Sequence, residues 1–194
     1  AQSPIDFNRI KELSNADDAR LVTIFKDIHE NPELGFMETR TAAIVAKELK
    51  SLGYNVMTGI GITGVVGILK NGEGPIVMYR ADMDCNSVVE TTGLPYASKK
   101  TAKRPDGTEV PVMHACGHDV HMTCVLGAAR ILHALRDRWT GAVMFVFQPG
   151  EEKIAGQPVR KVGSTLTLAE PEATIRRASA TVCCPSVKTP ADSS

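Results

Sequence analysis

Several residue classes are scarce in this 194-residue sequence, and each scarcity excludes a class of protein. Five cysteines are too few for a disulfide scaffold of this length, and their odd number leaves at least one thiol unpaired. Basic and acidic residues balance at 22 each, so nothing predicts a nucleic-acid or anionic-membrane partner. No apolar run approaches the roughly 20 residues of a membrane span. The remaining composition, 43% hydrophobic and 23% charged, is typical of a globular domain.

The sequence begins with alanine instead of methionine. Ala1-Gln2-Ser3-Pro4 is what remains after a signal peptidase cuts behind small residues, and a trimmed domain would look the same. We therefore expect a periplasmic or secreted protein if a signal peptide has been removed, and a cytoplasmic protein otherwise.

Helical patterns recur along residues 1 to about 150. Ser14 or Asn15 is the expected cap of a first helix that ends at Pro32, and a second helix is expected from Glu38 to Leu52. A third helix is expected from about Asp119. Its predicted buried stripe is Cys124, Val125, Ala128, Ile131, Leu132 and Leu135.

Strand-like runs lie between these helices. The β-branched stretches predict strands over residues 54–57, 65–69, 76–79 and 143–147. Asn71-Gly72 predicts a turn between the second and third of them. Their nearly continuous apolar character predicts strands buried on both faces. The expected fold is therefore α/β, a mixed, mostly parallel sheet with helices on both faces.

Residues 153–194 have a different composition from the rest of the chain. This stretch has no aromatic residue and is rich in proline, serine and threonine. It has more basic than acidic residues and little hydrophobic periodicity. We expect a folded body over residues 1–152 and a divergent, poorly ordered tail over residues 153–194.

The densest chemical cluster is His114-Ala115-Cys116-Gly117-His118-Asp119-Val120-His121. Thiolate and imidazole are the ligands that borderline divalent metals prefer. The glycine between Cys116 and His118 lets the backbone bend, so both side chains can point at one position. On this motif alone, a buried cysteine with capping histidines remains the better interpretation.

Two acidic clusters strengthen the metal hypothesis. Asp82-Met83-Asp84 and Glu151-Glu152 each follow a predicted strand, and ligands gather at the carboxyl edges of strands in α/β sheets. Adjacent glutamates allow one to bind metal while the other activates water as a general base. His29 and His133 are assigned structural roles, and Cys85 and Cys124 are expected to be core or near-core thiols.

Together these clusters resemble the zinc- or manganese-dependent amidohydrolases of the aminoacylase and acetylornithine-deacetylase superfamily. The most similar branch contains hippurate hydrolase and the indole-acetyl-amino-acid hydrolases. The resemblance covers roughly residues 21–152. It rests on His29-Glu30-Asn31-Pro32-Glu33-Leu34-Gly35-Phe36, Arg80-Ala81-Asp82-Met83-Asp84, His114 to His121, and Phe147-Gln148-Pro149-Gly150-Glu151-Glu152.

Carried over position by position, the resemblance implies three metal ligands: Cys116 as the bridging one, His118 and Glu152. It implies that Glu151 is the general base and that Asp84 orients the site. By position, His114, Asp119 and His121 would surround the ligands. The implied reaction is hydrolysis of the amide bond of a small N-acyl amino acid, with up to two divalent metals in the family. Zinc or manganese suits the donor set, and cobalt or nickel is compatible with it.

The sequence also departs from the family pattern. No histidine follows His133, and Arg176 lies near the position where the family has a further histidine ligand; a guanidinium stays protonated and cannot replace it. The resemblance implies that residues 1–152 are a partial catalytic domain and that the family's lid-like dimerisation domain has no counterpart in this sequence. We therefore expect fewer than two metals and weak or absent turnover. The alternatives are a metal- or ligand-binding remnant without catalysis and a non-functional fragment, and the oligomeric state stays open.

Overall fold

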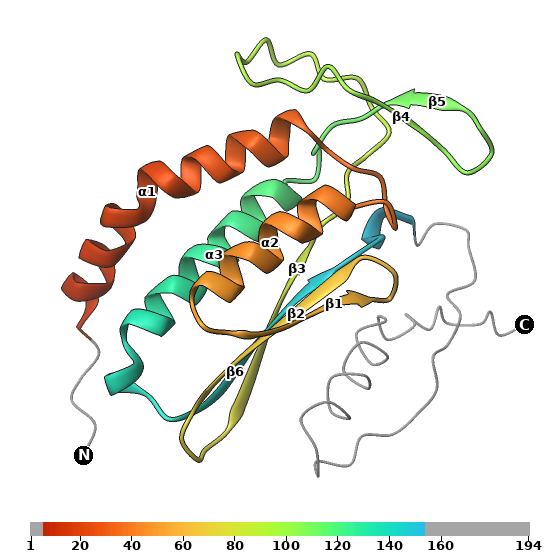
Figure 1. Cartoon of the computed structure of the whole chain (residues 1–194). Helices are drawn as coiled ribbons and strands as arrows, with labels where there is room; N and C mark the ends of the chain where they lie inside the picture. The colour runs from red at the N-terminus through yellow and green to blue at the C-terminus, as the bar shows by residue number, and fades with distance from the viewer. Residues whose placement is uncertain (1–5, 154–194) are drawn as a thin grey trace, which may run out of the picture. The chain divides into compact units, whose positions relative to one another are not determined.

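The computed structural model describes residues 6–153, which form an α/β domain of three helices and a mixed sheet (Figure 1). The α/β class predicted from the sequence is confirmed. The elements in chain order are α1 (Phe7–Glu30), α2 (Thr39–Ser51), β1 (Asn55–Ile60), β2 (Gly64–Asn71), β3 (Ile76–Asp82), β4 (Thr101–Lys103), β5 (Glu109–Pro111), α3 (His118–Ala134) and β6 (Gly141–Gln148), with short 3-10 turns at Arg136–Arg138 and Glu151–Lys153.

The main sheet has the order β1-β2-β6-β3. The β1–β2 and β2–β6 pairs are antiparallel, whereas β3 and β6 are parallel. The predicted turn at Asn71-Gly72 exists, and Gly72 has a φ of 81°, but the strands on either side of it are not neighbours because β6 lies between them. Since β3 and β6 run in the same direction, their carboxyl ends meet at one edge of the sheet.

The described helices lie on one face of the sheet (Figure 1). Helices α2 and α3 contact the strands directly, and α1 packs against α3. Their shared core contains Leu49 of α2, Leu126 of α3, Phe145 of β6 and Val65 of β2, all essentially fully buried. Close packing is required at Gly67, where an added Cβ would lie 2.7 Å from Leu49 Cδ1. Burial of this apolar area is the main stabilising contribution to the fold.

Two helix predictions need correction. Helix α1 begins at Phe7 instead of near residue 15, because the Asp6 carboxylate caps it by accepting from the Arg9 N–H. On α3, the expected buried residues Cys124 and Ala128 are exposed. The sheet-facing side of α3 carries residues 122, 125, 126 and 129 instead, so the predicted stripe was rotated around the helix.

Burial differs among the strands. Strands β2 and β6 are buried on both faces over most of their length, as predicted. Strand β3 contradicts the prediction, since residues 76–79 are exposed. Its position at the end of the sheet explains the difference, because only β6 pairs with it among residues 6–153. Within the same range, no helix combines the length and hydropathy that crossing a bilayer requires.

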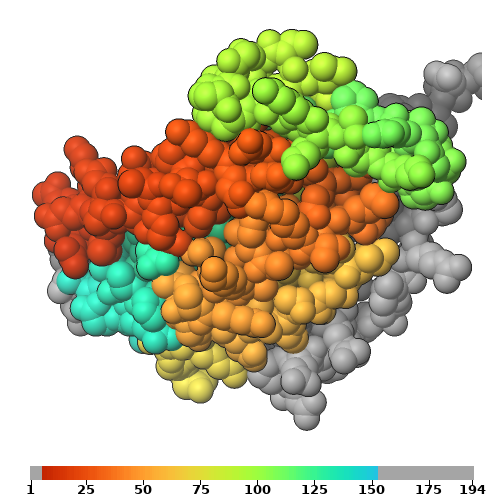
Figure 2. Space-filling model, turned by 45° about the horizontal axis from the view of Figure 1, so that its top comes forward, coloured from red at the N-terminus to blue at the C-terminus, as the bar shows by residue number. Residues whose placement is uncertain are grey.

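The segment between β3 and α3 forms an excursion from the sheet that carries the small β4–β5 hairpin. In Figure 2 this segment, in green, lies against the end of α1 and the turn after it. The contact includes a bridge between Leu34 and Cys85. Cys85 is buried there, as predicted. The predicted division at residue 152 and the expected tail lie essentially outside the described residues, so both stay predictions.

Candidate metal centre

The two acidic clusters lie together because of the parallel β3–β6 pair. Asp82, the last residue of β3, pairs with Gln148, the last residue of β6. Just beyond these ends, the Met83 N–H donates to the Gln148 carbonyl over 2.9 Å. The chain then places Asp84 on one side and the Glu151-Glu152 turn on the other. The two acidic clusters, each predicted to follow a strand, therefore meet because of the sheet register.

Asp84 holds the glutamate turn through the backbone. One carboxylate oxygen accepts from the Glu151 N–H over 3.0 Å, and the other accepts from the Glu152 N–H over 2.9 Å. The Asp84 side chain is fully buried. Hydrogen bonds to an ionised acceptor are stronger than neutral ones, so this bidentate contact restrains both glutamates.

His118 begins α3 beside the same carboxylate. Gly117 before it has a φ of 75°, the left-handed conformation that glycine adopts without strain. The ring Nδ1 lies 2.8 Å from the Asp84 backbone carbonyl, so an Nδ1–H donor leaves Nε2 available as a ligand. Nε2 lies 3.8 Å from Glu151 Oε2 and 3.9 Å from Glu152 Oε1. The nearby Asp84 carboxylate raises the pKa of His118 to about 9 despite its burial.

These three side chains form a compact donor cluster. The ligand atoms of His118, Glu151 and Glu152 all lie within 4.8 Å of one another. The pKa of Glu151 is raised, first by burial and then by the negative charges of Asp82 and Glu152. Asp82 is also buried, and one of its oxygens has no hydrogen-bond partner. Carboxylates crowded around one imidazole, with incomplete charge compensation, are a donor arrangement that fits a divalent cation.

Cys116 lies at the exposed side of this cluster. Its Sγ is 3.7 Å from the Asn86 amide nitrogen, and its backbone N–H donates to the Asn86 side-chain oxygen over 3.2 Å. A hydrogen bond with the Glu152 carboxylate, followed by burial, raises the pKa of the thiol. Cys116 is not one of the three residues whose donor atoms lie within 4.8 Å of one another, so the gathered donors are one imidazole nitrogen and carboxylate oxygens. A thiolate added to them would give a combination that suits zinc and other borderline metals.

Two supporting residues were missed by the sequence reasoning. Asn86 is one, because a single asparagine in a loop carries no recognisable pattern. The other is Glu38, which is fully buried and accepts from the Gly150 N–H over 2.9 Å and from the Thr63 hydroxyl. Burial raises the pKa of Glu38. The one sequence feature that pointed to Glu38 was its position. It lies two residues after the His29 to Phe36 motif and four residues before Ala42, the first buried alanine of α2.

His29 has a structural position behind the centre. Its Nδ1 lies 2.6 Å from an Asp119 oxygen, and its Nε2 lies 3.1 Å from a Glu90 oxygen. Burial lowers the pKa of His29, but hydrogen bonds to Asp119 and Glu90 outweigh this effect and leave the pKa raised. The contact ties the end of α1 to the start of α3 and to the 86–100 segment.

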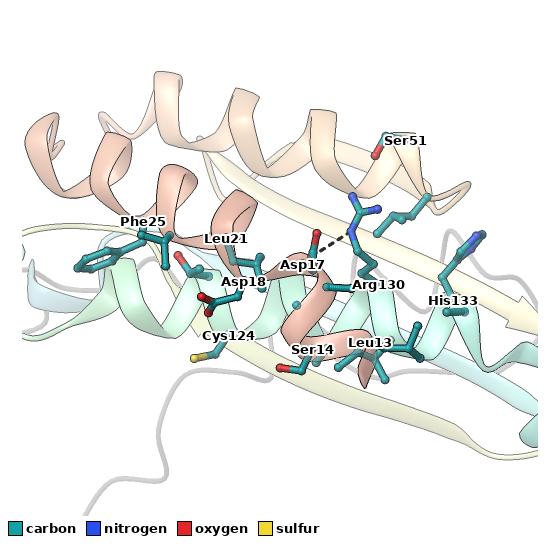
Figure 3. A pocket seen from close by; sticks show the side chains of 18 of the residues that line it. Leu13, Ser14, Asp17, Asp18, Leu21, Phe25, Ser51, Cys124, Arg130 and His133 are labelled. Carbon is teal, nitrogen blue, oxygen red and sulfur yellow. Dashed lines mark ion pairs between the residues drawn. The ribbon is translucent and has the colours of Figure 1, made fainter. Parts of the chain in front are cut away.

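The other two histidines of the cluster differ in environment. His114 is buried with neither ring nitrogen hydrogen-bonded, and burial lowers its pKa to about 4. His121 is half-buried and contacts the Tyr79 ring edge-on at a centroid distance of 6.4 Å. Of the residues expected around the ligands, Asp119 and His114 are therefore buried, whereas His121 faces Tyr79 of β3. Cys124, expected near the core, is exposed and lines a groove that contains none of the metal-centre residues (Figure 3).

Comparison with known proteins identifies the lineage. The family model described as "Peptidase family M20/M25/M40" matches residues 78–189, which is more than half of the chain. The chain belongs to this family. The matched range includes the 82–84, 116–118 and 151–152 clusters, and it continues past residue 152.

Individual relatives of this M20 chain agree with that assignment. It is 49% identical over 130 residues to hippurate hydrolase of Campylobacter jejuni, covering 66% of the chain and 31% of the relative. It is 43% identical over 136 residues to IAA-amino acid hydrolase ILR1-like 2 of Arabidopsis thaliana, covering 70% and 29%. The chain thus spans about a third of the length of the curated relatives it matches.

A solved structure shares the fold of this chain. The M20 chain aligns with the YXEP protein of Bacillus subtilis, described as a dinuclear metal binding peptidase from the M20 family, with a TM-score of 0.63 and 36% identity. The alignment covers 71% of this chain and 37% of that structure. The mixed α/β fold is therefore that of M20 catalytic domains.

Proposed function

We propose that this chain holds a divalent metal through Cys116, His118 and Glu152 and uses the site for amide hydrolysis. The observation that carries the proposal is the gathering of the His118, Glu151 and Glu152 donor atoms within 4.8 Å of one another. Zinc or manganese is the proposed metal. When bound, such an ion lowers the pKa of a water molecule and polarises a carbonyl.

The chain's own residues would supply the proton transfers. Glu152 is the proposed ligand, and Glu151 is the proposed general base that takes a proton from water and passes it to the leaving amine. Asp84 holds both glutamates through their N–H groups, so it sets the separation between base and ligand. Its backbone carbonyl also orients the His118 ring.

The proposed substrate is a small N-acyl amino acid. The names of similar proteins support this class, since they include hippurate hydrolase, IAA-amino acid hydrolase and an N-acetylcysteine deacetylase of Bacillus subtilis. We further propose weak turnover for this chain as it stands. The reason is chemical: three protein ligands suit one metal, and they are too few for two metals in a closed site.

Metal titration tests the ligand set. We expect calorimetry with Zn²⁺ to give roughly one ion per chain, and Cys116→Ser and Glu152→Gln to weaken binding at least about tenfold. Co²⁺ binding should produce a thiolate-to-metal absorption band that Cys116→Ser abolishes. Cys124→Ser is the matched control, because this thiol is also exposed but lies on another surface. A band that survives Cys116→Ser would refute the ligand assignment.

Hydrolysis separates an enzyme from a metal-binding remnant. On a panel of N-acyl amino acids that includes hippurate, we expect slow release of the free amino acid that requires Zn²⁺ or Mn²⁺. Glu151→Gln should remove turnover while metal binding remains within about threefold. Metal binding without any turnover in the wild type would favour the non-catalytic alternative.

A further inference from the structure

The His29 side chain joins two carboxylates in the interior of the described domain. Its Nδ1 lies 2.6 Å from Asp119 Oδ2, and its Nε2 lies 3.1 Å from Glu90 Oε1. All three side chains are buried, with exposed fractions of 8% for His29, 2% for Asp119 and 0% for Glu90. An ionised carboxylate only accepts hydrogen bonds, so both ring nitrogens donate. We call these three residues the His29 bridge.

Aromatic side chains restrict the orientation of the imidazole in this bridge. The His29 ring contacts Phe25, one turn earlier on α1, at a centroid distance of 5.6 Å, and it contacts Tyr96 edge-on at 5.5 Å. Phe25 and Tyr96 also contact each other, at 5.8 Å. With a neighbouring ring on each of these contacts and a carboxylate at each nitrogen, the imidazole has little freedom to rotate.

The Asp119 end of the bridge lies beside a proposed metal ligand. Asp119 directly follows His118 at the start of α3. Its second carboxylate oxygen accepts from the Val120 N–H over 2.9 Å, and its backbone carbonyl accepts from the Thr123 hydroxyl over 2.7 Å. Asp119 is thus tied to the first turns of α3 by side chain and backbone. Its contact with His29 therefore fixes the start of α3, where His118 lies, relative to α1.

The Glu90 end of the bridge lies in the segment that contacts Cys116. Glu90 Oε2 accepts from the Ser98 N–H over 2.5 Å, which ties together the two ends of residues 90–98. Four residues before Glu90, the Asn86 side-chain oxygen accepts from the Cys116 N–H over 3.2 Å. Asn86 also exchanges backbone hydrogen bonds with Met113. The segment held by His29 therefore carries the contact that orients Cys116.

The covalent chain alone does not fix the two side chains relative to each other. Only Gly117 separates Cys116 from His118, and its φ is 75°. Glycine is the residue with the greatest backbone freedom, so the relative direction of its two neighbours is set by contacts elsewhere. The His29 bridge supplies such contacts on both sides of this glycine.

We propose that His29 is a positioning residue of the metal centre. Through Glu90 and Asp119 it holds the two segments that orient Cys116 and His118, so that both side chains keep one relative position before metal arrives. This inference rests on the proposed function, which takes Cys116 and His118 as ligands. Residues that orient ligands from outside the coordination sphere change metal affinity by about 10- to 100-fold when they are replaced.

Metal binding by the full chain tests the consequence. His29→Gln should raise the Zn²⁺ dissociation constant at least about tenfold, because one amide group cannot donate to both carboxylates. It should also weaken or shift the Co²⁺–thiolate absorption band. Ile28→Val is the matched control, since Ile28 precedes His29 on α1 but is buried in the apolar core. The control should leave the Zn²⁺ dissociation constant within about twofold of wild type. Urea unfolding checks that each variant is folded.

Glu90→Gln is a milder second variant. It keeps the His29–Asp119 contact, but its amide has one acceptor oxygen where Glu90 uses two. We expect a rise in the Zn²⁺ dissociation constant that is smaller than that of His29→Gln and larger than that of Ile28→Val. Affinities and Co²⁺ bands of both bridge variants that match those of Ile28→Val would overturn the positioning role.

Hydrogen exchange provides a readout that needs no metal. In the metal-free chain, His29→Gln should speed exchange of the Cys116 N–H, which donates to Asn86, more than exchange of the amides in β6. Equal acceleration at both places would show only a global loss of stability and would overturn the inference. A wild type that binds no Zn²⁺ refutes the proposed function, whereas selective exchange at Cys116 would still support the bridge. Cys116-dependent metal binding that both bridge variants retain refutes the inference alone.

Discussion

Replacing Asp84 by alanine removes the contact that holds the two glutamates of the metal centre. The buried carboxylate accepts from the Glu151 and Glu152 N–H groups, and it lies 3.6 Å from His118 Nδ1. In Asp84→Ala both N–H donors lose their partner. Glu151 and Glu152 then lose the restraint on their positions, and the His118 ring loses its neighbouring charge.

The expected loss of stability can be worked from these contacts. A hydrogen bond to a charged group contributes about 1.5–3 kcal/mol, so two bonds set an upper value of about 3–6 kcal/mol. Two effects reduce it: Glu151 and Glu152 are half-buried, so water reaches the freed donors, and Asp84 repels the nearby carboxylate of Glu151. We expect about 2–3 kcal/mol, which lowers Tm by roughly 4–12 °C for a chain of this length.

Urea unfolding and calorimetric Zn²⁺ titration measure the two consequences. Asp84→Ala should lower the metal affinity by about 10- to 100-fold. Asp84→Asn should be intermediate, because its amide keeps one acceptor oxygen. Asp17→Asn is the control, since Asp17 also holds charged partners, Arg20 and Arg130, but lines a groove that contains none of the metal-centre residues. Stability within about 0.5 kcal/mol of wild type, together with unchanged affinity in Asp84→Ala, would refute the reasoning.

Two further predictions concern stability away from the ligands. The raised pKa of His29, which lies between Asp119 and Glu90, means that the folded chain binds this proton more tightly than the unfolded chain. The contribution of this proton to stability is complete below the unfolded pKa of about 6.5 and is lost as pH rises through the folded pKa. Urea titrations should therefore show that His29→Gln lowers the free energy of unfolding more at pH 6 than at pH 9. Gly141→Ala should cost about 3–4 kcal/mol, because φ is 107° and the added Cβ would lie 2.3 Å from a backbone carbonyl. Gly72→Ala, with φ of 81° and open space, should cost only about 1 kcal/mol, and equal costs would contradict the steric argument.

Local sequence patterns correctly predicted those features that depend on residues close together in the sequence. The predicted second helix, 38–52, differs from α2 by one residue at each end. The predicted glycine bend between Cys116 and His118 is observed as a left-handed Gly117. Such features depend on side-chain periodicity and on backbone freedom at a single residue, so they survive without knowledge of the rest of the fold.

Predictions failed where the answer depended on distant residues. The apolar run of β3 resembles that of β6, yet β6 is central and β3 is at the edge. The helical period of α3 was correct, but its buried side is set by the sheet beneath it, so Cys124 is exposed. Glu38 supports the glutamate turn across more than a hundred residues, a contact that no local pattern encodes.

The amino-acid sequence alone was sufficient to predict the α/β class and the residue types that we propose for the centre. Thiol, imidazole and paired carboxylates are properties of residue types, and they persist in any conformation. Only the tertiary structure decided which of these groups meet. The parallel β3–β6 pair brings Asp84 to the Glu151 and Glu152 backbone, and the order of strands leaves β3 exposed. Both outcomes depend on long-range strand pairing, whose energy comes from contacts between residues far apart in the chain.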